Sequence, residues 1–257
     1  MSFLKIQNMK LPDFIVIGET KCGTSSFFED LVKHPNINPS KPIDCKADYM
    51  GGKLSLDQKE IRFFDRHWAK GFDWYKNRFI DELDIITGEA SPTYMYRALA
   101  MKRISQYLPN IKLIIMLRNP IDRLYSHFHH IGGIVPKWEI RYPTFETFLN
   151  KAHENDYYII DKGIYINPVQ RCFKQFQKDQ IHIIRSEDFF KNPVDTYKKT
   201  IDFLGLIDFV PDKFSHLRKS GFKKSMRIKT RKDLLKFYSP YNEELYSLIN
   251  RDMGWNN

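Results

Sequence analysis

Two glycines and a lysine near the start of the chain have the spacing of a loop that binds phosphate. Gly18 and Gly23 are separated by four residues, and Lys21 lies between them. Glycine adopts positive φ at little cost, so the backbone amides of such a loop can approach an anion closely. A helical pattern begins at Thr24, and the amino end of a helix adds a partial positive charge. The pattern from Gly18 to Ser25 therefore predicts a phosphate site.

The position of the lysine separates this loop from the loop of nucleoside triphosphatases. In the Walker A pattern a lysine directly follows the second glycine, and here that residue is Thr24. Lys21 lies inside the loop, where it could contact the oxygen that bridges a phosphate to a departing group. Hydrolysis of ATP or GTP is therefore disfavoured, and an ATP-dependent kinase-like enzyme is kept as an alternative.

A second group of polar residues follows the apolar run at residues 111–118. Arg118 ends this run, and Asn119 and Pro120 suit the cap and the first position of a helix. Ser126 then falls two turns into that helix. Arginine suits a multidentate contact with phosphate. Taken alone, however, Arg118 is more simply read as a salt-bridge partner of Asp122 or Glu89, and Ser126 as a hydroxyl on the helix surface.

Short apolar runs supply the strands that must hold both segments. They are rich in β-branched residues, which is typical of strands buried on both faces of a parallel sheet. In chain order the predicted strands cover residues 14–18, 84–87, 111–118 and 181–185, and the predicted helices cover residues 24–34, start again at residue 120, and cover residues 194–204. This alternation predicts an α/β fold, a single P-loop-type domain over residues 1–257 with a central parallel sheet flanked by helices on both faces. Ligands of such sheets bind at the carboxyl ends of the strands, where Gly18 and Arg118 fall.

Both polar segments resemble motifs of one enzyme family. The loop from Lys21 to Ser26 resembles the 5′-phosphosulfate loop of sulfotransferases that use 3′-phosphoadenosine-5′-phosphosulfate (PAPS), and the segment from Arg118 to Ser126 resembles their 3′-phosphate motif. The resemblance implies in-line transfer of the sulfuryl group from PAPS to an acceptor, with PAP as the product. The implied nucleotide ligands are Lys21, Cys22, Gly23, Thr24, Ser25, Ser26, Arg118 and Ser126.

A third segment is similar to the heparan sulfate group of these enzymes, which includes N-deacetylase/N-sulfotransferases and 3-O-sulfotransferases. It runs from Lys59 through Asp65, and Gly71 to Tyr75 continues the similarity. In that group a glutamate is the catalytic base, and carried onto this chain it is Glu60, which would accept the proton of a hydroxyl or amine acceptor. Lys59 would orient Glu60 or neutralise sulfuryl oxygens, and Lys21 would stabilise the leaving group. Glycan, lipid and small-alcohol acceptors stay open.

The basic segment at residues 218–225 lies roughly where family members close a loop over the nucleotide. We therefore expect Lys219, Lys223 or Lys224 to reach the 3′-phosphate, and a solvated basic surface is the alternative. No metal is expected, because lysine and amide donors can do what magnesium does elsewhere. His127 and His130 are neighbours on one helix face, and we interpret them as surface or cleft-lining residues.

The charge balance favours anionic ligands. Lys and Arg number 41 against 31 Asp and Glu, which gives a net charge of +10. A non-enzymatic polyanion-binding protein is thus a third reading, although no motif for nucleic acid is recognisable. The sequence gives no indication of an oligomeric state.

Cysteine content and hydropathy suggest where the protein works. Three cysteines at no metal-like spacing indicate neither disulfides nor zinc, and Cys22 at a helix amino end is expected to have a lowered pKa and to be oxidisable. The first residues lack the apolar core of a signal peptide, and the longest apolar run, residues 113–117, is too short to span a bilayer. We therefore expect a cytoplasmic protein.

Overall fold

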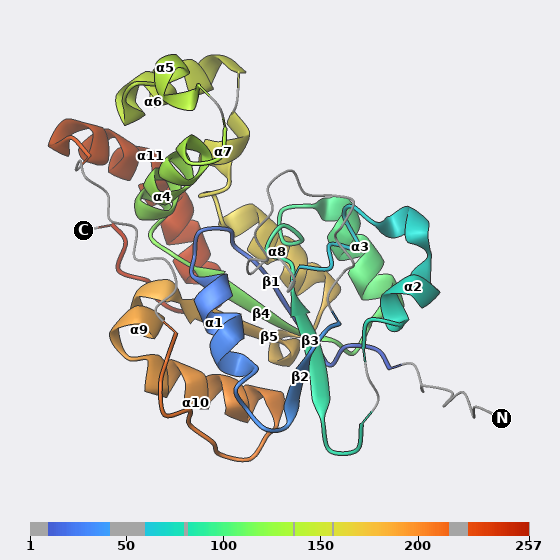
Figure 1. Cartoon of the computed structure of the whole chain (residues 1–257). Coiled ribbons are helices and arrows are strands. Elements are labelled where there is room, and N and C mark those ends of the chain that lie inside the picture. Colours follow the sequence, from blue (N-terminus) through green and yellow to red (C-terminus); the bar gives the residue numbers. More distant parts are fainter. Residues whose placement is uncertain are drawn as a thin grey trace.

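A parallel five-stranded sheet forms the centre of the molecule (Figure 1). The computed structural model describes residues 10–41, 60–79, 82–135, 137–155, 157–215 and 226–256. The strands are β1 (Phe14–Gly18), β2 (Ile37–Pro39), β3 (Ile86–Ala90), β4 (Lys112–Leu117) and β5 (Ile181–Arg185). Their order in the sheet is β2-β3-β1-β4-β5, and every neighbouring pair is parallel. The predicted α/β fold with a central parallel sheet is confirmed.

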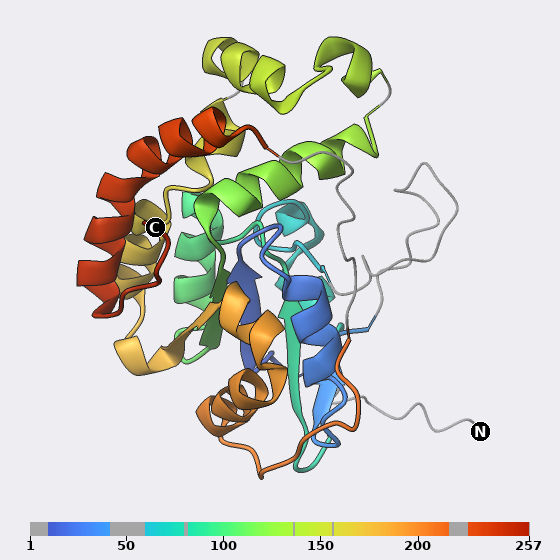
Figure 2. The same cartoon turned by 90° about the vertical axis from the view of Figure 1, so that its left-hand side faces the viewer.

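Helices cover both faces of this sheet and the carboxyl ends of its strands. They are α1 (Thr24–Leu31), α2 (Phe72–Lys76), α3 (Ala98–Tyr107), α4 (Pro120–Gly132), α5 (Trp138–Arg141), α6 (Phe145–Asn155), α7 (Tyr157–Asp161), α8 (Ile166–Gln175), α9 (Ser186–Lys191), α10 (Pro193–Leu204) and α11 (Ile228–Ile249). Two 3₁₀ turns, η2 (Trp68–Lys70) and η3 (Lys178–Gln180), complete the described elements. Figure 2 shows α4 lying across the ends of the strands, between the sheet and helices α5 and α6.

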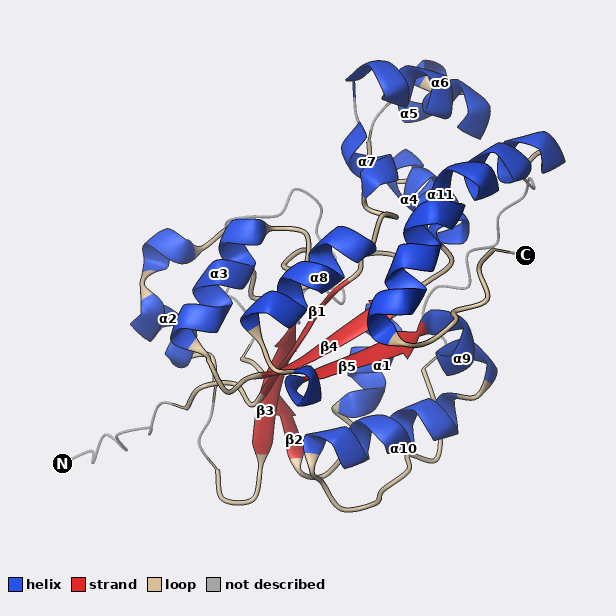
Figure 3. Ribbon diagram, turned by 180° about the vertical axis from the view of Figure 1, so that it is seen from behind, coloured by secondary structure: helices blue, strands red, loops and turns tan. Residues whose placement is uncertain are grey.

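The alternation of side chains along β1 divides the core into two layers. Ile15 and Ile17 are fully buried against α2, α3, α8 and α11. Phe14 and Val16 point to the opposite face and are buried against α1, α9 and α10. These two layers are visible on either side of the sheet in Figure 3. Because β1 is apolar on both faces, its position in the middle of the sheet is fixed, and so is the loop that leaves it.

Two strands differ from the sequence-based prediction. β3 covers Ile86–Ala90 rather than residues 84–87, so it includes Gly88 and Glu89. Gly88 lies against a neighbouring ring, since a Cβ there would come within 2.5 Å of Cζ of Phe14. β2 was not predicted, because it has three residues and includes Pro39, which is tolerated on an edge strand. Most of the chain between β2 and Glu60, residues 42–59, lies outside the described residues.

Candidate active site

The predicted phosphate loop connects β1 to α1. Lys21 and Gly23 both have positive φ, at 71° and 88°. Gly23 is the residue that caps α1, and no side chain caps the helix, so the amides of the first turn face the loop. The residues Thr24, Ser25 and Ser26 form that first turn, and Thr24 and Ser26 are buried. This geometry fits the binding of an anion by backbone amides.

Residues of α9 fix the loop from one side. The Ser186 hydroxyl donates to the carbonyl oxygen of Cys22 at 2.7 Å, and this serine is fully buried. The ring of Phe190 covers Gly23, because a Cβ at that glycine would lie 2.7 Å from Cζ of Phe190. Positive φ favours glycine at position 23, and a Cβ there would also have to displace the Phe190 ring.

Arg118 meets the loop from the neighbouring strand. β4 pairs directly with β1, with Ile115 opposite Gly18, and Arg118 follows the end of β4. The Arg118 guanidinium donates from Nη1 to the carbonyl oxygen of Lys21 at 3.4 Å. The Tyr165 hydroxyl in turn donates to the carbonyl oxygen of Arg118 at 2.9 Å. The two predicted phosphate-binding segments therefore lie side by side.

Helix α4 carries the other half of the predicted 3′-phosphate motif. The Asn119 side chain accepts from the amide of Ile121 at 3.0 Å, which confirms the predicted cap, and Pro120 is the first helical residue. Ser126 is two turns further along and only 7% exposed. The same helix thus starts beside Arg118 and carries Ser126.

The segment that begins with Glu60 contacts the carboxyl end of β3. The amide of Ile61 donates to Oε2 of Glu89 at 3.3 Å, and Glu89 is near the carboxyl end of β3. β3 is the other neighbour of β1, so the Glu60 segment contacts the strand next to the one that leads into the phosphate loop. Lys59, Lys219, Lys223 and Lys224 lie outside the described residues.

A buried ion pair beneath the loop was missed by the sequence analysis. Glu19 is fully buried, and its Oε1 accepts from the amide of Thr20 at 2.7 Å. The ammonium of Lys162, which is 4% exposed, lies 3.8 Å from that carboxylate oxygen and 3.5 Å from the Thr20 hydroxyl. Since the two partners are far apart in sequence, only the fold shows that they meet.

The comparison with known proteins agrees with this arrangement. The family model of the sulfotransferase domain matches residues 11–235. The chain belongs to the sulfotransferase family. The predictions of a sulfotransferase and of its α/β fold are thereby confirmed.

The sequences of several proteins that are named as sulfotransferases align with most of this chain. The human heparan sulfate glucosamine 3-O-sulfotransferase 3B1 is 29% identical over 96% of this chain and 65% of its own length. The Caenorhabditis briggsae bifunctional heparan sulfate N-deacetylase/N-sulfotransferase 1 is 26% identical over 77% of this chain and 23% of its own length. The chain therefore spans less than two thirds of these relatives. A solved sulfotransferase from Alicyclobacillus acidocaldarius has a TM-score of 0.75 and 27% identity over 96% of this chain and 100% of its own.

The expectation of a cytoplasmic sulfotransferase was wrong. The Dictyostelium discoideum membrane-associated sulfotransferase kil1 is 23% identical over 96% of this chain and 67% of its own length. Among the described residues, no helix combines the length and the apolar character that crossing a bilayer requires. A related protein is thus named as membrane-associated. Composition and the lengths of apolar runs were not sufficient to predict the cellular compartment.

The predicted reactivity of Cys22 was also wrong. The thiol is fully buried, and burial, followed by the nearby Glu19 carboxylate, raises its pKa to about 12. Arg118 and Arg123 lower the pKa by a smaller amount. The helix amino end had suggested a reactive thiolate, but the cost of burying a charge is larger.

This burial gives a test with thiol reagents. Burial also raises the pKa of Cys172 to about 12, and a rise of three units leaves roughly 1,000-fold less thiolate at pH 8. In a Cys45→Ser variant, we expect labelling of the two remaining thiols to be at least about 100-fold slower in native protein than in denatured protein. Native labelling at the rate of a free thiol would contradict the burial of Cys22.

The histidines of α4 do not form a metal site. Arg123 is fully buried, and its Nη1 lies 3.2 Å from Nδ1 of His127. Burial, Arg123 and then Lys162 lower the pKa of His127 to about 2, so the ring is neutral and accepts from the guanidinium. No group of three or more His, Cys, Asp or Glu in the described part of the chain could hold a metal.

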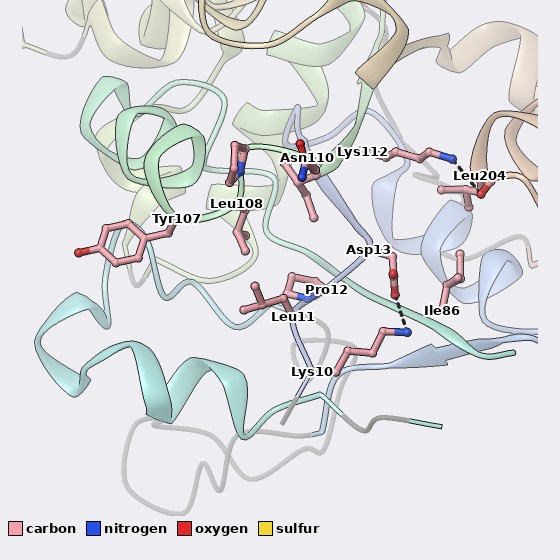
Figure 4. A pocket seen from close by; sticks show the side chains of 12 residues that line it. Lys10, Leu11, Pro12, Asp13, Ile86, Tyr107, Leu108, Asn110, Lys112 and Leu204 are labelled. Carbon is pink, nitrogen blue, oxygen red and sulfur yellow. Dashed lines mark hydrogen bonds and ion pairs between the residues drawn. The ribbon is translucent and has the colours of Figure 1, made fainter. Parts of the chain in front are cut away.

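Two cavities lie away from the phosphate loop. One cavity, of about 600 Å³, lies at the amino ends of the strands, where Lys10 and Asp13 form an ion pair of 3.3 Å (Figure 4). The other, of about 410 Å³, lies between α6 and α11. Neither cavity includes Lys21, Arg118 or Glu60.

The buried carboxyl of Glu89 makes stability depend on pH. Burial raises its pKa to about 7, and hydrogen bonds, led by that of Ser91, offset only part of this effect. The fold therefore favours the protonated acid, and this contribution is complete below pH 4.5 and is lost as pH rises through 7. We expect the advantage of the native protein over Glu89→Gln in the free energy of unfolding to fall by about 2 kcal/mol from pH 5 to pH 8. Urea unfolding of both proteins at the two pH values measures this, and an advantage that grows with pH would contradict it.

Proposed function

We propose that the protein transfers the sulfuryl group of PAPS to a hydroxyl or amine of a glycan. The observation that carries this proposal is the contact of 3.4 Å between the Arg118 guanidinium and the carbonyl oxygen of Lys21. It joins a segment suited to the 3′-phosphate with a loop suited to the 5′-phosphosulfate. One adenosine carries both groups, so its two binding segments must share a pocket.

The transfer is an in-line displacement at sulfur. The acceptor oxygen or nitrogen attacks the sulfur and loses its proton to Glu60, while the bond between sulfur and the bridging oxygen of the 5′-phosphate breaks. Charge develops on that bridging oxygen as PAP departs. Lys21 and the amides of residues 23–25 stabilise this charge. Lys59 orients Glu60 or neutralises sulfuryl oxygens.

The nucleotide is bound mainly through its phosphates. The loop residues Lys21 to Ser26 hold the 5′ end, and Arg118 and Ser126 hold the 3′-phosphate. Lys219, Lys223 or Lys224 adds a cation to the 3′-phosphate. The cationic side chains supply the charge that magnesium supplies in ATP-dependent enzymes, so binding should not need a metal.

The acceptor is proposed from the relatives and from charge. The two relatives compared above are named for heparan sulfate, a polyanionic glycan. A net charge of +10 favours such an acceptor over a neutral one. Ala90 departs from several heparan sulfate enzymes, which have a lysine at this position, and this departure counts against a glycosaminoglycan acceptor, so other acceptors are tested beside it.

A transfer assay tests the proposed function. Radiolabelled PAPS is incubated with the protein in EDTA and with desulfated heparan, a lipid extract or simple alcohols as acceptors. Label that enters the polysaccharide and is released by heparan-degrading lyases supports the proposal. Label only in lipid or alcohol contradicts the glycan acceptor, and turnover of ATP with magnesium but none of PAPS contradicts sulfuryl transfer.

A further inference from the structure

A buried carboxylate has no role in the reaction as proposed. Glu89 is fully buried near the carboxyl end of β3, and each of its two carboxylate oxygens accepts two hydrogen bonds. Oε1 accepts from the hydroxyls of Tyr75 at 2.8 Å and Tyr94 at 3.3 Å. Oε2 accepts from the Ser91 hydroxyl at 2.6 Å and from the amide of Ile61 at 3.3 Å.

Two of these hydroxyl groups also accept hydrogen bonds from the backbone amides that follow Glu60. The amide of Arg62 donates to Oγ of Ser91 at 3.0 Å. The amide of Phe64 donates to the hydroxyl oxygen of Tyr94 at 3.3 Å. Residues 60–65 belong to no strand, so these side chains take the place of a neighbouring strand.

The ionised carboxylate determines which way the hydroxyls of this group donate. Above its pKa of about 7 the Glu89 carboxylate is ionised and only accepts, so Ser91 and Tyr94 must then donate their single protons to Glu89. Their lone pairs are then left to accept the amides of Arg62 and Phe64. A neutral amide in place of the carboxylate would donate as well, and one hydroxyl would have to reverse.

The turn after β3 also contacts the start of the phosphate loop. The amide of Met95 donates to the carbonyl oxygen of Ile17 at 2.9 Å. A Cβ at Gly18 would lie 2.9 Å from Cβ of Met95, so the turn packs tightly on the last residue of β1. The same short turn is therefore fixed both to the Glu60 segment and to the strand that carries the loop.

We propose that Glu89 is a positioning residue that, with Ser91 and Tyr94, holds Glu60 at a fixed place relative to the phosphate loop. This inference rests on the proposed function, in which Glu60 is the base. Proton transfer and in-line attack require the base within hydrogen-bonding reach, and a displacement of about 1 Å can lower a rate about 100-fold.

Two tyrosines provide a matched pair of variants. Tyr75 and Tyr94 are both fully buried and both donate to Oε1 of Glu89. Tyr94 accepts an amide of the Glu60 segment directly, whereas the Tyr75 hydroxyl reaches that segment only through Glu89, which accepts the amide of Ile61. Tyr94→Phe therefore removes a link to Glu60 that Tyr75→Phe retains, for the same loss of one hydroxyl.

The test measures kcat, the KM for the acceptor, the Kd for PAP and the melting temperature at pH 8. We expect Glu89→Gln to lower kcat by about 10- to 100-fold and Tyr94→Phe by about 10-fold, with Tyr75→Phe within about 2-fold of the native value. The Kd for PAP and the KM should stay within about 2-fold in all three. Tyr94→Phe should lower the melting temperature more than Tyr75→Phe does, because it also leaves the amide of Phe64 without its acceptor.

Different results separate this inference from the proposed function. Equal kcat in Tyr94→Phe and Tyr75→Phe, or a loss of PAP binding parallel to the loss of kcat, would overturn the positioning role of Glu89. Full activity of Glu60→Gln would instead overturn the role of Glu60 as the base. Should Glu89→Gln fail to fold, the tyrosine pair still decides the matter.

Discussion

Glu60→Gln is expected to abolish sulfuryl transfer while PAP still binds. The glutamine has almost the same shape as the glutamate, but its amide cannot take a proton from the acceptor. Loss of a general base lowers rates by about 100- to 10,000-fold. Initial rates with labelled PAPS measure the loss, and calorimetry with PAP measures binding, which should stay within about 2-fold because Glu60 acts on the acceptor and is not one of the proposed nucleotide ligands.

The control is a glutamate far from the site. Glu244 is exposed on α11, so Glu244→Gln should leave both the rate and the binding of PAP unchanged. A rate in Glu60→Gln close to that of the control would remove Glu60 from the role of base. Loss of PAP binding in Glu60→Gln would indicate a nucleotide ligand instead.

Arg118→Ala is expected to weaken PAP binding by about 30- to 100-fold. A charged hydrogen-bonding group on a phosphate contributes roughly 2 to 3 kcal/mol, and the guanidinium can use two N–H groups for one phosphate. The substitution also removes the bond of 3.4 Å that Arg118 donates to the carbonyl oxygen of Lys21. With PAPS at saturation, kcat should fall much less than the affinity, because the 3′-phosphate does not take part in bond breaking.

Two further variants check that the effect belongs to this guanidinium. Arg118→Lys keeps the charge but not the planar fork, so it should restore only part of the affinity. Arg66→Ala removes an exposed arginine close to the Glu60 segment and should leave the Kd for PAP within about 2-fold. An Arg118→Ala variant that binds PAP as the native protein does would contradict the assignment of the 3′-phosphate motif.

The sequence predicted the elements that are most uniform in composition. β1, β4 and β5 are short apolar runs, and α4 has an asparagine cap followed by proline, so each was found close to its observed limits. β3 was misplaced because it includes Gly88 and Glu89, whose presence depends on contacts with Phe14 and Tyr75. Such contacts between distant segments have no local signature.

The sequence also predicted only part of the candidate site, because some of its contacts join segments that are distant in the chain. Lys21 and Arg118 stand in recognisable motifs at strand ends, and parallel strands bring such ends together. The reactivity of Cys22 was predicted wrongly, since the motif gives the helix end but not the burial. The pair of Glu19 and Lys162 was missed, because neither residue has a partner at a characteristic spacing.

The most direct test of the account compares ligands that each lack one phosphate. Calorimetry in EDTA would measure Kd for PAP, adenosine 5′-phosphate and adenosine 3′-phosphate with the native protein, Lys21→Met and Arg118→Ala. We predict that Lys21→Met weakens the two ligands with a 5′-phosphate and spares adenosine 3′-phosphate, and that Arg118→Ala weakens the two with a 3′-phosphate and spares adenosine 5′-phosphate. Equal losses for all three ligands in both variants would contradict the claim that these two segments hold opposite ends of one nucleotide.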